Sequence, residues 1–494
     1  MNRQIRRVSV AFGVLFVALL LNLDYVQVVK GDTYRDDPRN RRVILNEYSD
    51  PRGQIIVEGA PIAESTKTSD ELEYLRQYPF GPQFAAVTGY YSLIYDKSGL
   101  EQAEDSVLSG SDPRLIGRRI SDILTGREPQ GGSVVLTLNK SAQLAAYRAL
   151  GGRKGAVVAL DPSTGAILAA VSSPSYDPSR LSSHNVDDIE TYWKQLISDP
   201  NQPLLNRALA TSYPPGSVFK VVVAAAALKD GLTPSTSLPA PSILTLPDTS
   251  TVMKNFDGEK CGDGNTDTLI DALTISCNTA FGQLGMTLGA DKLRTEAALF
   301  GINGEPRTVG LAVGRSTVGA ISDSDQAALA QSAIGQRDVQ LTTLQIAMIS
   351  AAVANGGELM APYLVQREQA PNLSALSNAT PKVLSTILTG AQDSQLQQMM
   401  VNVVQKGTGT KAQISGVTVG GKTGTADNED ANGKALAPHA TFTGYAIRDG
   451  LPKIAVAVVL ENAGVTGSES AGGLAAAPVA QQVMSAYLND PASN

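Results

Sequence analysis

The sequence predicts an α+β protein in which a mainly antiparallel sheet packs against helices. Residues 155–173 contain two apolar runs around a turn with proline and glycine, which is the pattern of a β-hairpin. Two later apolar runs, residues 221–231 and 341–357, end in glycine and are expected to be buried helices. Three strands are expected near the C-terminus: residues 416–426, 440–447 and 453–462. Strands followed by helices and then by strands are typical of an α+β fold.

Composition narrows the classes of protein to which the chain can belong. Its 494 residues are 43% hydrophobic and 18% charged, so most of the chain can bury a core. The net charge is −7 and no run of lysine or arginine predicts a basic face, which argues against a nucleic-acid partner. Only two histidines are present, His184 and His439, so a multi-histidine metal site is excluded. We expect neither a metal nor a cofactor.

The N-terminus has the pattern of a membrane anchor. Three arginines within residues 1–7 precede the apolar run Val8–Leu21, which continues more weakly to Val29. Positive charge before such a run places residues 1–7 in the cytoplasm. The clean apolar core is short enough for a cleaved signal peptide, but no small-x-small cleavage site follows it. We therefore expect an uncleaved, single-pass anchor in the cell membrane over residues 8–29, with everything after it outside the cytoplasm.

The region after the anchor is expected to form a small domain of its own. Residues 31–50 are charged and polar, and are interpreted as a membrane-proximal segment. Residues 51–65, PRGQIIVEGAPIAES, place β-branched residues between turn formers and predict a hairpin. Because residues 66–150 mix short strands and loops, we expect a small β-rich domain over residues 30–150. The main domain is then expected over residues 151–490.

The two cysteines, Cys261 and Cys277, are expected to form a disulfide. Outside the cytoplasm an even pair of cysteines usually pairs. Closing so short a loop is worth about 3 kcal/mol on the loop-entropy model. The alternative is a pair of buried thiols.

A serine follows Pro-Pro-Gly at the start of an apolar run, with a lysine three residues later. Pro214-Pro215-Gly216 ends regular structure, so Ser217 should lie at a helix N-terminus, where backbone N–H groups favour negative charge. Lys220 then lies one turn away on the same face. Serine is a poor nucleophile without a base, and a lysine can serve only when burial or a second cation favours its neutral form. A helix cap beside a solvated lysine would show the same residues, so this motif alone is weak.

Two further motifs strengthen the chemical interpretation. The first is Ser276-Cys277-Asn278, although Ser183-His184-Asn185 also has the Ser-x-Asn pattern. The second is Lys422-Thr423-Gly424, which falls on an expected strand. Gly424 would let a ligand approach the strand backbone closely. Lys422 and Thr423 would then offer a cation and a hydroxyl to a carboxylate, whereas the plain alternative is a turn between strands.

In this order, Ser-x-x-Lys, Ser-x-Asn and Lys-Thr-Gly resemble the motifs of the penicillin-recognising serine enzymes. The segments NRALATSYPPGSVFK, SAIGQRDVQLTTLQIAMISAAVANGG and VGGKTGTA also resemble penicillin-binding proteins, and PRGQI resembles the start of their non-catalytic domain. The chain is therefore identified as a member of the class B penicillin-binding proteins. The resemblance implies the penicillin-binding transpeptidase fold, an antiparallel sheet flanked by helices. A dimerisation or pedestal domain and one transmembrane helix would precede it.

By this resemblance, the chain would be a serine-type D,D-transpeptidase that cross-links peptidoglycan stem peptides and is inhibited by β-lactams. Ser217 would attack the carbonyl between two D-alanines, with Lys220 as the base. Ser276 would relay protons and Asn278 would hold the substrate amide. An acceptor amine of a second stem peptide would then take the acyl group.

The remaining site residues are expected to bind the donor. Lys422 and Thr423, next to Gly424, would bind the terminal carboxylate, and Lys422 would be the second cation near the base. Backbone N–H groups of Ser217 and Thr425 would form the oxyanion hole. The sequence departs from related proteins after this strand, where His-Ala-Trp-Phe is common and the chain reads His439-Ala440-Thr441-Phe442. We expect no catalytic role for the histidine.

Several other functions share these motifs. A D,D-carboxypeptidase would use the same acyl-enzyme, and a non-catalytic scaffold would keep the fold for its partners. A penicillin hydrolase would not need the N-terminal domain, and a β-lactam sensor would need several membrane spans. A glycosyltransferase domain would not fit before residue 150, so a membrane glycosyltransferase and division or elongation proteins are expected partners. The sequence does not indicate the acceptor amine.

Overall fold

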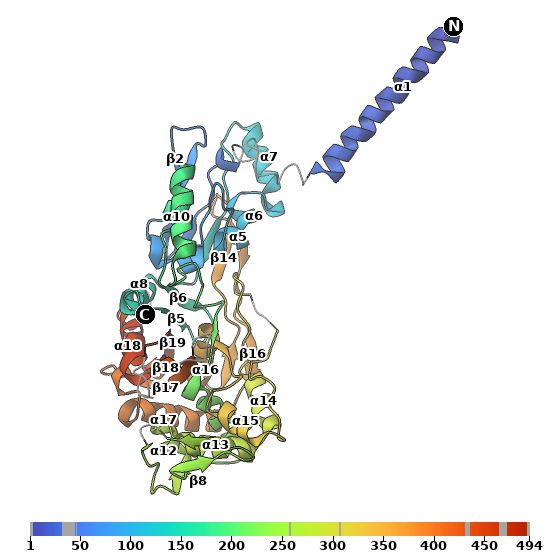
Figure 1. The fold of residues 1–494 in the computed structure, drawn as a ribbon. Coiled ribbons are helices and arrows are strands. Elements are labelled where there is room, and N and C mark those ends of the chain that lie inside the picture. The colour runs from blue at the N-terminus through green and yellow to red at the C-terminus, as the bar shows by residue number, and fades with distance from the viewer. Residues whose placement is uncertain are drawn as a thin grey trace.

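The computed structural model describes residues 3–31, 45, 47–255, 258–305, 308–429, 435–463 and 472–491. An N-terminal helix, α1 (Arg3–Asp24), continues through a π-helical turn, η1 (Tyr25–Val29), and projects away from the folded body (Figure 1). Within the described ranges, Arg3–Val29 is the one helix long and apolar enough to cross a membrane, and its apolar stretch is not buried against the body. Most of the expected membrane-proximal segment, residues 31–50, lies outside the described residues.

A five-stranded antiparallel sheet forms the centre of the larger domain. Its strand order is β17-β18-β19-β5-β6, so the two ends of the domain sequence meet in one sheet. The strands are β5 (Gly155–Leu160), β6 (Ile167–Ser173), β17 (Thr418–Glu429), β18 (Ala435–Arg448) and β19 (Leu451–Leu460). The predicted hairpin and all three predicted late strands are confirmed.

Both faces of this sheet are covered by helices, which explains why β5 and most of β19 are apolar on both faces. On one face Val157 and Val458 pack with helices α8 (Lys140–Leu150) and α18 (Ala477–Leu488). On the other face Val158 and Ala457 pack with a larger helical core that contains α16 (Thr343–Ala354). Side chains alternate between the two faces along a strand, so a sheet buried on both sides needs an unbroken apolar run.

The smaller domain contains the six-stranded sheet β15-β14-β4-β1-β2-β3. Its strands are β1 (Ile55–Val57), β2 (Ala60–Lys67), β3 (Tyr74–Gln77), β4 (Ser133–Leu136), β14 (Val365–Gln369) and β15 (Ala375–Asn378). The predicted hairpin over residues 51–65 is confirmed as β1 and β2. Strands β14 and β15 come from the middle of the larger domain, so the sheet is completed by residues far away in the sequence.

Short helices take up more of residues 66–150 than the sequence pattern indicated. They are η2 (Gly81–Gln83), α4 (Ala85–Thr88), α5 (Gly99–Ala103), α6 (Asp105–Leu108), η3 (Pro113–Leu115) and α7 (Ile116–Leu124). Helices this short give no hydrophobic periodicity over a long window, so the sequence pattern did not predict them. Helix α8 falls before residue 151 but packs against the central sheet. The domain boundary at residues 150 and 151 stays a prediction.

The remaining helices and turns are α9 (Pro178–Leu181), α10 (Val186–Ser198), η4 (Gly216–Phe219), α11 (Lys220–Lys229), α12 (Leu269–Thr274), α13 (Asn278–Leu288), α14 (Ala290–Leu299), α15 (Gln326–Ala333), α17 (Gly390–Lys406), η6 (Thr410–Ala412) and η7 (Gly472–Ala476). The short strand pairs are β7 (Ser212–Tyr213) with β12 (Leu341–Thr342), β8 (Ser237–Pro239) with β11 (Thr266–Thr268), β9 (Ile243–Thr245) with β10 (Val252–Lys254), and β13 (Glu358–Met360) with β16 (Val383–Thr386). Of these elements, α10 lies beside the smaller domain, while α12, α13, α14, α15 and β8 lie at the far end of the body (Figure 1). The two predicted buried helices are confirmed as α11 and α16.

Candidate active site

Ser217 lies in a tight turn beside the edge of the central sheet. The 3₁₀ turn η4 holds this serine and continues directly into α11. Gly216 has a φ of 55°, and a Cβ atom there would lie 2.3 Å from the carbonyl oxygen of Thr425 on β17. Only glycine fits where the turn touches the strand so closely. The predicted position of Ser217 at the start of an apolar helix is confirmed, and the residue is only 7% exposed.

Lys220 is completely buried and joins the first motif to the second. Its Nζ atom donates hydrogen bonds to the backbone oxygen of Ser276 at 2.7 Å and to Asn278 Oδ1 at 2.6 Å. It also lies 3.3 Å from Ser276 Oγ. The alternative reading of Lys220 as a solvated surface charge is therefore wrong. Residues that are 56 positions apart in the sequence come into direct contact.

Lys422 is also completely buried and approaches the same serine from the edge strand. Its Nζ atom donates to Ser276 Oγ at 2.8 Å and to the backbone oxygen of Thr423 at 3.0 Å. Two lysines therefore converge on one hydroxyl. Burial penalises charge and two nearby cations repel each other, so this arrangement favours the loss of a proton from one of them. Lys422 is therefore a second cation near Lys220, and such a cation was expected to favour the neutral form of Lys220.

Ser276 is held in an unusual backbone conformation. Its φ of 66° is in the left-handed region, which a non-glycine residue adopts at a cost of about 1–2 kcal/mol. Cys277 follows it, is buried, and forms the predicted disulfide with Cys261, with the Cα atoms 6.1 Å apart. The prediction of this disulfide is confirmed. Helix α13 begins at Asn278, so the covalent link and the helix start together fix the loop that carries Ser276.

Gly424 is needed for a reason that the sequence did not indicate. A Cβ atom at this position would lie 2.5 Å from the carbonyl oxygen of Pro215 and 3.1 Å from Val218. The turn that carries Ser217 occupies that space, so the glycine brings strand and turn together. That a ligand also approaches the strand backbone at Gly424 stays a prediction. The alternative that Lys422-Thr423-Gly424 is a turn is wrong, because all three lie within β17.

A cavity of about 320 Å³ opens where these elements meet. It is lined by the side chains or backbone of Ser217, Glu259, Ile275, Ser276, Lys406, Gly407, Thr408, Thr410, Lys411, Thr423, Thr425, Gly473 and Leu474. Four residues predicted from the motifs, Ser217, Ser276, Thr423 and Thr425, therefore share one cavity. Lys220, Asn278 and Lys422 are not among its lining residues.

Sequence reasoning missed Thr408, which lies in the same cavity. Its hydroxyl is 2.6 Å from the hydroxyl of Thr423. Thr408 lies in the glycine-rich stretch KGTGTKA at the end of α17. None of the three motifs is next to this stretch in the sequence, so the sequence did not predict that it belongs to the site. Lys406, Lys411 and Glu259 were also missed, because charged residues are common on any protein surface.

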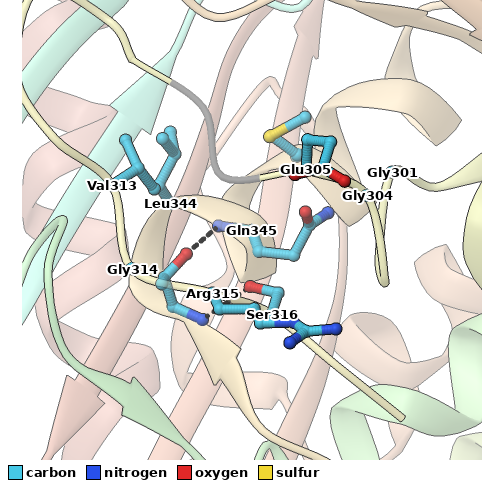
Figure 2. A pocket seen from close by; sticks show the side chains of 11 residues that line it. Gly301, Gly304, Glu305, Val313, Gly314, Arg315, Ser316, Leu344 and Gln345 are labelled. Carbon is cyan, nitrogen blue, oxygen red and sulfur yellow. Dashed lines mark hydrogen bonds between the residues drawn. The ribbon is translucent and has the colours of Figure 1, made fainter.

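A second pocket is too small to be the substrate site. Figure 2 shows it at the start of α16, where Gly314, Gln345 and their neighbours surround a space of about 20 Å³. That volume holds a water molecule but no peptide. None of the residues predicted from the three motifs lines this pocket.

Each of the two histidines forms hydrogen bonds with residues outside the three motifs, although His439 on β18 pairs in the sheet with Ala426, two residues beyond the third motif. His439 Nδ1 accepts a hydrogen bond from the backbone of Asn462 at 3.3 Å, and burial lowers the pKa of the imidazole. His184 lies 2.7 Å from Asp70 and belongs to the second Ser-x-Asn match. In that match Asn185 caps α10, so the pattern there is a helix start.

Two family models match the chain, and together they include most of it. The model described as the penicillin binding protein transpeptidase domain matches residues 155–485. The chain belongs to the penicillin-binding protein transpeptidase family. A second model, the penicillin binding protein A dimerisation domain, matches residues 52–134. The resemblance to class B penicillin-binding proteins, and the fold it implied, are confirmed.

Relatives of known identity agree with the two family models. The peptidoglycan D,D-transpeptidase PbpA of Mycolicibacterium smegmatis is 45% identical over 99% of this chain and 100% of its own length. The MrdA transpeptidase of Haemophilus influenzae is 31% identical over 84% of this chain and 70% of its own. Among solved structures, the ceftriaxone acyl-enzyme of penicillin-binding protein A from Mycobacterium tuberculosis has a TM-score of 0.85 and 43% identity. That match covers 90% of this chain and 99% of the solved chain.

Proposed function

We propose that this protein is a membrane-anchored D,D-transpeptidase that cross-links peptidoglycan stem peptides through an acyl-enzyme on Ser217. The observation that carries the proposal is the convergence of Lys220 and Lys422 on Ser276 Oγ, in a cavity that Ser217 also lines. The two lysines are buried and come from different motifs. Burying two lysine side chains costs free energy, because both can carry a positive charge. Such an arrangement is expected at a site that uses proton transfer.

The first half-reaction forms the acyl-enzyme. Lys220 in its neutral form takes the proton of Ser217 as the serine oxygen attacks the carbonyl between two D-alanines. The negative charge that develops on the carbonyl oxygen is stabilised by the backbone N–H groups of Ser217 and Thr425. Ser276 passes a proton to the departing amine, so D-alanine leaves with its nitrogen neutral. The hydrogen bonds that link Ser276 to both lysines supply the path for this proton.

Substrate binding is assigned to the edge strand and the start of α13. The hydroxyl groups of Thr423 and Thr425 line the cavity and receive the terminal carboxylate of the donor, while Lys422 behind them supplies positive charge. Asn278 orients the donor amide through its side chain.

In the second half-reaction the amine of another stem peptide attacks the ester carbonyl and gives a proton to neutral Lys220. The bond between the acyl carbon and Ser217 Oγ then breaks, and the serine oxygen takes that proton back from Lys220.

The anchor and the domain arrangement give the proposal its setting in the cell. Helix α1 with η1 crosses the membrane once, residues 1–7 lie in the cytoplasm, and the domains 30–150 and 151–490 lie outside. The smaller domain is non-catalytic. We expect partners among membrane glycosyltransferases and division or elongation proteins, because the chain itself makes no glycan. β-Lactams acylate Ser217 in place of the donor peptide.

A fluorescent penicillin tests the nucleophile directly. The full chain in detergent should carry one covalent label, and Ser217→Ala should carry none, as read by denaturing gel and intact mass. Ser183→Ala, in the second Ser-x-Asn match, is the matched control and should label as the wild type does. Absence of label on folded wild-type protein would refute the catalytic reading and favour a non-catalytic scaffold.

The second half-reaction separates the remaining alternatives. A donor pentapeptide is supplied with an excess of a D-amino acid as the acceptor amine, and the products are weighed by mass spectrometry. Exchange of the terminal residue supports the transpeptidase, whereas release of D-alanine with water alone would support the carboxypeptidase. A penicillin adduct that decays within minutes would support a penicillin hydrolase.

A further inference from the structure

Helix α7 exposes its apolar face to the outside of the molecule. Ile116, Ile120 and Leu124 follow one another at every fourth position and are 50%, 54% and 81% exposed. Residues at this spacing lie on one face of a helix. A helix on the surface of a soluble domain normally turns such a face inward.

The polar face of the same helix is the one that contacts the protein. Asp122 is only 9% exposed and pairs with Arg118 at 3.5 Å. Arg119 pairs with Asp50 at 3.3 Å. The first pair lies within α7, whereas the pair with Asp50 ties the helix to the body on the side away from the apolar stripe. The apolar face therefore needs another environment.

The position of α7 shows which environment is available. Asp50 belongs to the first described stretch of the body after the anchor, so α7 is bound to the part of the chain that comes from the membrane. Figure 1 shows α7 at the end of the body from which α1 projects, while the central sheet lies further along the body. The chain between residues 31 and 47 spans at most roughly 55 Å when fully extended. The anchor therefore keeps α7 within reach of a bilayer at all times.

Given the membrane anchor proposed above, we propose that α7 inserts its apolar face into the outer surface of that membrane. Ile116, Ile120 and Leu124 enter the boundary between headgroups and acyl chains, as in other amphipathic helices that lie in the interface. Arg127 lies exposed just beyond the helix, where anionic headgroups attract it. Because α1 already tethers the protein, this second contact needs only a small affinity of its own.

A bilayer suits this face better than a protein partner does. Among the side chains that the structure describes on this nine-residue helix, the stripe has three aliphatic members and no aromatic one. Stable protein interfaces bury roughly 1,200–2,000 Å² and depend on tryptophan, tyrosine and arginine anchors. A lipid surface does not require shape complementarity. With two points of attachment, the elongated body has a fixed direction, and the catalytic cavity has a fixed distance from the membrane.

The test places an environment-sensitive fluorophore on each face of α7 in the full chain. Ile120→Cys and Leu124→Cys carry the label on the apolar face, and Ser121→Cys carries it at an exposed position outside the stripe as the matched control. Each labelled protein is reconstituted into vesicles of phosphatidylethanolamine and phosphatidylglycerol, with or without a nitroxide on the lipid acyl chain. Labelling with fluorescent penicillin reports that each variant is folded, and a carbonate wash reports that the anchor is inserted.

Nitroxide lipid should quench the labels at positions 120 and 124 several-fold more strongly than the label at position 121. Equal and weak quenching at all three positions, in protein that is anchored and binds penicillin, would overturn the proposal. An apolar emission spectrum without lipid quenching would also overturn it, and would indicate a second copy or another protein on this face. Loss of penicillin labelling or release by carbonate would instead point to failure of the proposed function or of its anchor.

Discussion

The hydroxyl of Thr408 is expected to set the direction in which Thr423 donates its proton. The two oxygens are 2.6 Å apart, and only one of the two hydroxyls can be the donor. If Thr408 donates, the proton of Thr423 remains available for a substrate carboxylate in the cavity. Thr408→Val keeps the shape of the side chain and removes this donor, whereas Thr408→Ser keeps the hydroxyl.

The loop around Thr408 should not move in the valine variant. A Cβ atom on Gly407 would lie 2.2 Å from the carbonyl oxygen of Thr274, and one on Gly473 would lie 2.4 Å from that of Thr408. Backbone packing this close holds the loop independently of the hydroxyl. The loss is therefore one neutral hydrogen bond, worth about 1 kcal/mol, which corresponds to about a five-fold change in a rate constant.

The assay is the second-order rate constant for acylation of Ser217 by benzylpenicillin, whose carboxylate takes the place of the donor terminus. Thr408→Val should be about five-fold slower than wild type, and Thr408→Ser should lie within two-fold of it. A thiolester without that carboxylate should acylate both variants at nearly the wild-type rate. Equal rates for all three proteins with benzylpenicillin would show that Thr408 does not orient the hydroxyl of Thr423. Equal slowing with the thiolester would show that the loop had moved.

Three further predictions concern stability. Burial raises the pKa of Asp393 to about 7, so the folded state favours its neutral form and stability falls as the pH rises from about 4 to 7. Asp393→Asn should therefore stabilise the protein above pH 7, on the order of 2–4 kcal/mol in urea unfolding, and no gain at pH 8 would contradict this. Replacing both Cys261 and Cys277 by alanine should lower the free energy of unfolding by about 3 kcal/mol. Acylation should also become slower, because the disulfide adjoins Ser276. An unchanged urea midpoint would contradict the predicted loss of stability. Glu101→Gln should cost about 3–5 kcal/mol in urea unfolding, because two buried arginines pair with that carboxylate; acylation of the folded fraction should stay the same.

Local patterns in the sequence predicted the elements of the central sheet well. The hairpin of β5 and β6, the helices α11 and α16, and the three late strands each follow from apolar runs that end in turn or stop residues. The motifs predicted which residues would meet, because chemistry restricts which side chains can share a buried site. The convergence of Lys220 and Lys422 on Ser276 is the result.

Features that depend on distant segments could not be predicted in this way. Strands β14 and β15 join the smaller domain's sheet, although they follow α16 in the sequence. No local sequence pattern predicts that β14 pairs with β4. The apolar face of α7 points outward while Arg119 pairs with Asp50, and hydrophobic periodicity alone cannot predict such a contact. The motif singled out Gly424, but its close contact with Pro215 could not be predicted, because the fold sets which neighbour lies there.

The site also explains why Ser276 carries a strained backbone instead of a relaxed one. Its carbonyl oxygen and its hydroxyl must both face Lys220, while the hydroxyl also faces Lys422 on another element. The left-handed conformation is the one observed with all three contacts in place, and the disulfide and the start of α13 hold it on one side. With two lysines donating to its oxygen, the proton of Ser276 is directed away from both of them. The strain at Ser276 is thus coupled to an orientation in which its proton is available to a leaving group.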